Sequence, residues 1–217
     1  AVGADNGYIY MRGEYSHLRP LLLSAVVTAA VGGLLSLLRA KTDFFAREGF
    51  FTAGLIWVLI GVFGALPFRI FGLLYPETGA FPTYIDALFE SLSGFTTTGA
   101  SILTAIEGLP YGLLFWRSFT HWLGGMGVLI LTIALLPSLG ARTLKAESPG
   151  PIVSKLVPKS SESSKILYGI YFALTVLEVI ALKLTGMPLY DCVVNSFATA
   201  GTGGFAILNL SIGGYHS

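Results

Sequence analysis

Residues 85–101 read IDALFESLSGFTTTGAS, an apolar segment that runs into threonine, glycine and other small residues. Residues 190–205 read YDCVVNSFATAGTGGF and follow the same plan. The first part of each stretch is long enough for about two and a half helical turns, which is too short to cross a bilayer. We therefore expect two half-helices, each followed by a non-helical strand of small residues.

The two stretches form an internal repeat. Aligning Gly99 with Gly203 sets a period of 104 residues, and this register also pairs Thr98 with Thr202. A long apolar segment precedes each half-helix. The sequence thus predicts repeated units of helix, half-helix and extended strand.

The composition indicates a membrane protein. Of 217 residues, 53% are hydrophobic and 12% are charged, whereas about a quarter of the residues in an ordinary soluble domain are charged. Segments with the roughly 20 mostly apolar residues that a spanning helix needs are residues 18–38, 50–74, 111–136 and 166–184. We predict an all-α integral membrane protein.

The same composition excludes other classes of protein. A formal net charge of +1 without an extended basic run argues against nucleic-acid binding. The single cysteine, Cys192, cannot form an intrachain disulfide, and the three scattered histidines form no metal-binding cluster. Because the sequence starts with Ala1 and shows no signal-peptide pattern, we expect a piece of a longer chain.

Charge also predicts the orientation in the membrane. Residues 39–49 and 137–165 contain several Lys and Arg, whereas residues 75–110 contain none and residues 185–217 contain only Asp191 as a charged side chain. The positive-inside rule places the first two segments in the cytoplasm and the other two outside. Residues 141–165 are rich in Pro, Ser and Lys and are expected to form a non-helical cytoplasmic connector.

The two outer stretches are suited to a cation. Non-helical backbone at membrane depth must be buried in protein or line an aqueous path. A half-helix that enters from outside points its partially negative C-terminal end toward the membrane centre, which favours a cation there. Carbonyl groups of the following strand can replace the water around an ion, and glycine permits the backbone angles that this needs. Small residues of this kind are Thr97, Thr98, Gly99, Gly201, Thr202, Gly203 and Gly204. The pattern predicts a selectivity filter; for one stretch alone, a surface loop rich in turn residues is an equal alternative.

The sequence resembles the superfamily of potassium transporters that includes the Trk, Ktr and plant HKT proteins, specifically the TrkH-type subunits of bacterial Trk systems. The matching stretches are SGFTTTGA at 93–100, FWRSFTHWLGGMG at 115–127 and TGGF at 202–205. The likeness covers about residues 45–217, and the first apolar segment fits by position only.

This resemblance implies potassium uptake across the bacterial plasma (inner) membrane, with K⁺ as the transported ion, no bound cofactor and no enzymatic activity. The family fold places four pore repeats around one pore. Its expected divisions here are an N-terminal segment with the first spanning helix (1–47), a first repeat (48–140), the connector (141–165) and an incomplete second repeat (166–217). By position, the ion-coordinating backbone falls on Thr97, Thr98, Gly99, Gly201, Thr202 and Gly203. Besides the lipid bilayer, the implied partners are a cytosolic, nucleotide-binding TrkA-like subunit and a second copy in a homodimer.

Other polar residues in or near the spans need an explanation. Arg117 and His121 are four residues apart on a predicted helix and share a face. We expect Arg117 and Gly204 to support the filter, and His121 to be hydrogen-bonded within the helix bundle. Asp86 and Glu90 are also four residues apart, and they either attract cations at the outer mouth or form a solvated acidic face.

Glycine and proline predict local features of the spans. Gly124, Gly125 and Gly127 should let their helix pack closely against a neighbour. Pro67 should kink the second span.

Two further functions are alternatives to a potassium-conducting pore. One is a membrane subunit that scaffolds a complex without conducting ions. The other is an intramembrane serine hydrolase, because Ser91-Leu92-Ser93-Gly94 resembles the nucleophile loop of such enzymes and His121 could serve as the base. The hydrolase is disfavoured because Ser91 stands where that motif has glycine and because it leaves the repeat unexplained.

Overall fold

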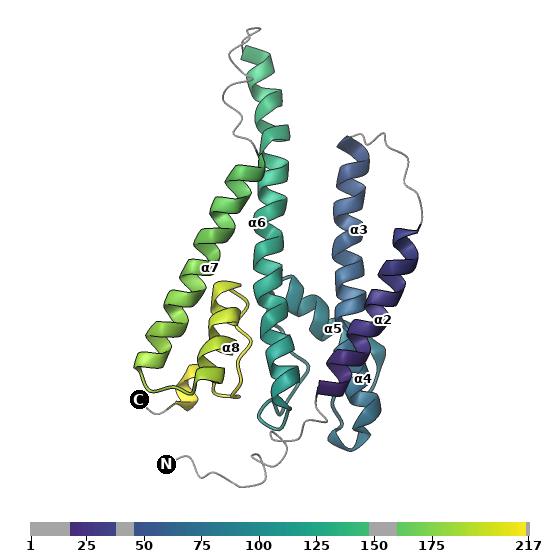
Figure 1. Ribbon diagram of the computed structural model, residues 1–217, viewed down its shortest axis with the longest axis vertical. Helices are drawn as coiled ribbons and strands as arrows, with labels where there is room; N and C mark the ends of the chain where they lie inside the picture. The colour runs from purple at the N-terminus through teal and green to yellow at the C-terminus, as the bar shows by residue number, and fades with distance from the viewer. Residues whose placement is uncertain (1–17, 38–45, 148–159, 216–217) are drawn as a thin grey trace.

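The computed structural model describes residues 18–37, 46–147 and 160–215, and this part of the chain contains helices and loops but no strand (Figure 1). The longer helices are α2 (Arg19–Ser36), α3 (Ala46–Gly64), α4 (Leu66–Leu74), α5 (Tyr84–Phe95), α6 (Tyr111–Glu147), α7 (Ser160–Leu184) and α8 (Leu189–Ala200). Two short 3-10 helices, η2 (Pro76–Thr78) and η4 (Ser211–Gly214), lie in the loops.

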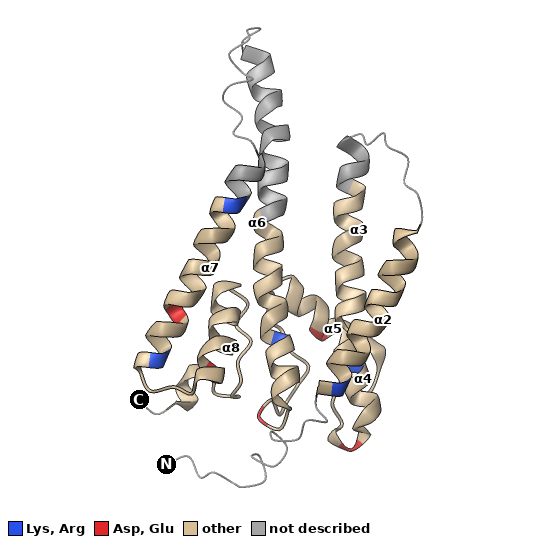
Figure 2. Ribbon diagram, in the orientation of Figure 1, with Lys and Arg blue, Asp and Glu red and all other residues tan. Residues whose placement is uncertain are grey.

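All four predicted spans are helical over nearly all of their described residues. Segments Arg19–Ser36, Phe51–Leu74 and Lys165–Leu184 are long and apolar enough to cross a membrane. Helix α6 contains the remaining predicted span, and its 37 residues extend about 55 Å at about 1.5 Å per residue. This is longer than the roughly 30 Å hydrocarbon core of a bilayer. The chain is an integral membrane protein, and Figure 2 shows how few charged side chains the described parts of its helices carry.

The second span is interrupted between Gly64 and Leu66, as predicted from Pro67. Helix α3 ends at Gly64 and α4 begins at Leu66, so that Pro67 lies in the first turn of α4. A proline is tolerated in that turn because its missing N–H group would have no helical partner there.

The prediction of a non-helical connector over residues 141–165 is wrong at both ends. Helix α6 continues to Glu147 and α7 begins at Ser160. Residues 142–147 read RTLKAE and are mostly good helix formers, whereas the prolines of this region all lie within residues 148–159. That segment, including Lys155 and Lys159, lies outside the described residues, as do residues 38–45 of the other predicted cytoplasmic loop.

The two predicted half-helices are α5 and α8, each 12 residues long. Helix α6 stands between them, with α5 packed between α3 and α6, and α8 packed between α7 and α6 (Figure 1). The loops that enter and leave both half-helices lie at the same end of the molecule (Figure 1). Each half-helix therefore enters the helix layer and the chain returns to the end from which it came.

A small apolar core joins the two units near this end. Val194 of α8 and Ile207 after it are 1% exposed and pack in the same cluster as side chains of α4, α5 and α6. The other members of the cluster are Ala65, Phe68, Phe71, Phe81, Ala87, Leu109, Leu113 and Leu114. The half-helices thus belong to one packed body, which fixes their relative positions.

Candidate ion-conduction site

The site begins with the start of the first half-helix. Thr83 is the N-cap of α5: its Oγ1 accepts a hydrogen bond from the Asp86 N–H at 3.2 Å, and the Thr83 N–H donates to Asp86 Oδ2 at 2.9 Å. This reciprocal pair is a capping box, which satisfies backbone donors that a helix start leaves free. Asp86 therefore has a structural role, and its effect on cations at the outer mouth stays a prediction.

The segments after the half-helices, residues 96–101 and 201–206, are called here the first and second loop segments. They have matching backbone conformations. Thr97 and Thr202 have φ angles of 55° and 56°, and Gly99 and Gly204 have φ angles of 74° and 84°. The backbone hydrogen bonds match as well, because the Thr98 N–H donates to Ser93 O and the Gly203 N–H donates to Ala198 O.

This match corrects the predicted register by one residue. The half-helices begin at Tyr84 and Leu189, an offset of 105 residues, and the paired φ angles keep that offset. The predicted period of 104 is wrong because both Gly203 and Gly204 can align with Gly99 in sequence, while only Gly204 shares its left-handed backbone. Gly204, predicted as a supporting residue, is thus the structural equivalent of Gly99, and Gly201 is the equivalent of Thr96.

The two loop segments touch each other. A Cβ atom placed on Gly99 would lie only 1.9 Å from the carbonyl oxygen of Gly203, so glycine is required there by close approach as well as by its φ angle. Further along, the Asn209 N–H donates to Glu107 Oε1 at 3.0 Å and the Ile106 N–H donates to Asn209 Oδ1 at 3.2 Å. These contacts join the two units across roughly a hundred residues of sequence.

Helix α6 packs against both half-helix ends through its glycines, as predicted. A Cβ atom on Gly124 would lie 2.1 Å from Phe95 O at the end of α5. A Cβ atom on Gly125 would lie 2.7 Å from the Tyr171 hydroxyl and 3.1 Å from Gly201 Cα. Side chains at these positions would push α6 away from one or both loop segments.

A buried ion pair lies beside the loop segments. Arg117 Nε on α6 is 2.8 Å from Glu90 Oε1 on α5, and the two side chains are 1% and 0% exposed. Ser101 Oγ donates to Glu90 Oε1 at 2.9 Å and accepts from Arg117 Nη2 at 3.1 Å, and the Ile102 N–H donates to Glu90 Oε2 at 3.2 Å. Arg117 Nη1 donates to Ala206 O at 3.3 Å. Each charge is therefore paired and hydrogen-bonded, as a buried charge requires.

Glu90 does not face the outer mouth or the solvent. Both predictions made for it are wrong, because its side chain is fully buried against Arg117. A signal for this was present in the sequence: an arginine inside an apolar span requires a partner, and Glu90 is an acidic residue in the neighbouring half-helix. Ser101, Phe205 and Ala206, which complete the surroundings of Arg117, were not predicted.

The ring of Phe205, in the second loop segment, lies against Arg117 and His121. Arg117 Cζ is 4.1 Å from the ring centroid, which is a cation–π geometry. The imidazole of His121 stacks on the same ring at 4.1 Å between centroids. His121 Nδ1 is 2.7 Å from Gly94 O, and because a carbonyl only accepts, Nδ1 carries the proton. The prediction that His121 is hydrogen-bonded within the bundle is confirmed.

The same contacts give no support to a serine hydrolase. Ser91 Oγ donates to Gly61 O at 2.9 Å, and His121 Nδ1 is paired with Gly94 O. Within the part of the chain that the structure describes, Ser93 Oγ and His121 Nε2 are both buried without a hydrogen-bond partner, so neither serine is hydrogen-bonded to the histidine as a nucleophile is to its base.

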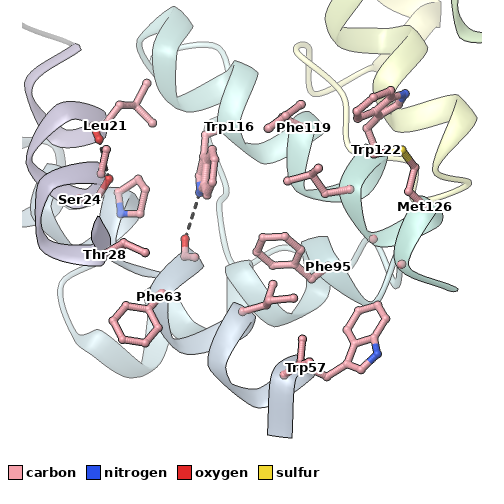
Figure 3. Close-up of a pocket in the computed structure, with 18 of the residues that line it drawn as sticks. Leu21, Ser24, Thr28, Trp57, Phe63, Phe95, Trp116, Phe119, Trp122 and Met126 are labelled. Carbon is pink, nitrogen blue, oxygen red and sulfur yellow. Dashed lines mark hydrogen bonds between the residues drawn. The ribbon is translucent and has the colours of Figure 1, made fainter. Parts of the chain in front are cut away.

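A separate apolar cavity of about 1430 Å³ lies between α2, α3, α6 and α7. Figure 3 shows Trp57, Phe63, Phe95, Trp116 and Phe119 around it, with the Trp116 Nε1–H donating to Gly64 O at 3.0 Å. The lining is almost entirely apolar and offers few oxygen atoms that could bind a bare cation, in contrast to the backbone of the loop segments.

Known proteins share both the sequence and the fold. The family model for TrkH, described as a cation transport protein, matches residues 19–217. The chain belongs to the TrkH family. Over 183 residues it is 41% identical to the Trk system potassium uptake protein TrkH of Salmonella typhimurium, covering 82% of this chain and 37% of that protein. The protein of the same name from Halomonas elongata is 40% identical over 197 residues, covering 88% of this chain and 40% of that protein.

A solved TrkH structure agrees with this assignment. The crystal structure of the potassium transporter TrkH from Vibrio parahaemolyticus matches with a TM-score of 0.76 at 32% identity, covering 94% of this chain and 40% of that one. This TrkH family chain spans about two fifths of the length of the relatives that it matches.

Proposed function

We propose that the protein takes part in potassium uptake across the bacterial plasma membrane, as part of a pore in which backbone carbonyls coordinate dehydrated K⁺. The choice of K⁺ rests on the relatives, which are named potassium uptake proteins or a potassium transporter. The backbone conformation of the loop segments supports our assignment of the coordinating residues. In the corrected register they are Thr97, Thr98 and Gly99, paired with Thr202, Gly203 and Gly204.

One observation carries this proposal: two half-helices with matching backbone beyond their C-terminal ends bring their loop segments into contact at Gly99 and Gly203. The C-terminal end of a helix carries partial negative charge, so two such ends near one point favour a cation. Positive φ angles at Thr97 and Gly99, and at Thr202 and Gly204, turn successive peptide groups away from a helical path. Carbonyl oxygens turned in this way can replace the water around a potassium ion.

The predicted residues divide into two roles in this proposal. The backbone of the loop segments contacts the ion. Arg117 supports the segments from α6, because it bonds to Ser101 in the first and Ala206 in the second. Gly201 is assigned to close packing, since a Cβ atom there would lie 2.4 Å from His121 O.

The wider setting is proposed from the family. The complete protein acts as a transporter rather than an enzyme, in the bacterial inner membrane, as a homodimer with a cytosolic, nucleotide-binding TrkA-like subunit. Two further pore repeats complete the ring around the ion.

The test is K⁺ and Na⁺ flux into liposomes that contain the full-length gene product, with Gly204→Ala beside the wild type. Gly204 has a φ angle of 84° and open space around its Cβ position, so alanine strains the backbone without a clash. Gly79→Ala is the matched control, because Gly79 also has a positive φ of 64° and open space but lies in the loop before α5. We expect K⁺ flux in the wild type, an altered ratio of K⁺ to Na⁺ flux in Gly204→Ala, and no change in Gly79→Ala.

Two results would count against the proposal. Absence of cation flux from folded wild-type protein, with or without an added cytosolic partner, would refute the proposal that the protein forms part of a potassium pore. An unchanged ratio of K⁺ to Na⁺ flux in folded Gly204→Ala would refute the assignment of the second loop segment to ion coordination.

A further inference from the structure

The guanidinium of Arg117 contacts both loop segments. It donates to Ser101 Oγ in the first and to Ala206 O in the second, and it lies over the ring of Phe205. An arginine remains charged at any physiological pH. One fixed positive charge therefore lies beside both segments to which the proposed function assigns cation binding.

A positive charge at this place opposes the binding of a cation. Burial strengthens the effect, because a protein interior screens charges less than water does. Among the described residues, the carboxylate of Glu90 is the ion-pair partner of Arg117, at 2.8 Å and with no exposure to solvent. The pair as a whole is neutral, while its arginine still supplies hydrogen bonds to both segments.

We propose that Glu90 is a charge-compensating residue that sets the K⁺ affinity of the pore by cancelling the charge of Arg117. This inference rests on the proposed function and adds a residue that does not touch the ion. Arginine provides a planar set of N–H donors that can reach several acceptors at once, and Glu90 lets the protein use those donors beside a cation site without repelling the cation.

A purely structural role for the ion pair makes a different prediction. Loss of either partner would then leave an unpaired buried charge and change K⁺ binding in the same direction, and loss of both could restore the fold. Charge compensation instead predicts opposite effects of the two single changes on K⁺ affinity. The sign of the change in K⁺ affinity separates the two roles.

The experiment uses the full-length protein in liposomes and measures K⁺ flux against K⁺ concentration. Three variants are compared with the wild type: Glu90→Gln, Arg117→Gln and the double variant. Glutamine at position 90 keeps an oxygen that can accept from the Ser101 hydroxyl and the Ile102 N–H. Glu77→Gln is the control for a general loss of negative charge, because Glu77 is exposed in the loop before α5.

We expect Glu90→Gln to raise the half-saturating K⁺ concentration about tenfold, which corresponds to about 1.4 kcal/mol. A unit charge left uncompensated within about 10 Å of a cation has an effect of this order at an effective dielectric constant of about 20. Arg117→Gln should lower the half-saturating concentration. The double variant should return to within about threefold of the wild type, and Glu77→Gln should not change it.

The outcomes separate this inference from the proposed function. Wild-type K⁺ flux with shifts of the same sign in both single variants would overturn charge compensation alone. Absence of K⁺ flux in the wild type would overturn the proposed function and this inference together. If Glu90→Gln fails to fold, the sign of the Arg117→Gln shift decides: a lower half-saturating K⁺ concentration supports charge compensation, and an unchanged or higher one overturns it.

Discussion

Replacement of Gly99 by alanine tests whether the contact between the loop segments matters. The new Cβ atom would lie 1.9 Å from Gly203 O, whereas real Cβ contacts stay beyond 3.0 Å, so the two segments must separate by at least the difference of 1.1 Å. Gly99 also has a φ of 74°, which costs a residue with a side chain about 1–2 kcal/mol. Overpacking against backbone adds about 1–3 kcal/mol.

Gly204→Ala is the comparison, because it carries the same backbone strain with open space around the new atom. We expect Gly99→Ala to destabilise the protein by about 1–3 kcal/mol more than Gly204→Ala, and to reduce the ratio of K⁺ to Na⁺ flux further. Thermal unfolding of the purified full-length protein gives the first quantity, and flux into liposomes gives the second. Equal stability and equal ion ratios in the two variants would refute the argument that contact between the two loop segments controls the site.

Three further changes test the packing around the site. Gly124→Ala should lower the free energy of unfolding by about 1–3 kcal/mol, because the new Cβ atom meets the backbone at Phe95 O. Gly127→Ala should lower it less, because the new atom meets the Trp57 side chain, which can move. Thermal unfolding of the two variants measures the difference. Asp86→Ala should lose the capping box of α5 and about 1 kcal/mol of stability, seen as faster hydrogen exchange in the first turn of α5; unchanged exchange would contradict the cap. Trp116→Phe should lose the hydrogen bond to a main-chain carbonyl of α3, costing about 1 kcal/mol, and equal unfolding temperatures would show that this bond contributes nothing.

The sequence was sufficient for the spans and the half-helices because their determinants are local, although it missed the ends of α6 and α7. Spans follow from runs of apolar residues. The half-helices could be recognised because each is too short to cross a bilayer and is followed by residues of low helix propensity.

The details of the site depend on contacts between distant residues. The register was wrong by one residue because the end of α8 decides which of Gly203 and Gly204 takes the left-handed backbone, and Gly201 at that end packs on His121 of another helix. Glu90 resembled a surface residue because it follows Asp86 by one helical turn. Its partner Arg117 is 27 residues away, and only the packing of α5 on α6 brings them together.

Helix α6 packs against both half-helices, and a long helix moves largely as one rigid body. If α6 tilts or rotates, its contacts at Gly124 with Phe95 and at His121 with Gly201 shift in the same motion. The two loop segments are thus coupled mechanically: a displacement of the helix carries them together and largely preserves the distance between them. That distance changes when a contact between the segments changes, as with a side chain introduced at Gly99, or when the side chains of Arg117 or His121 on α6 change.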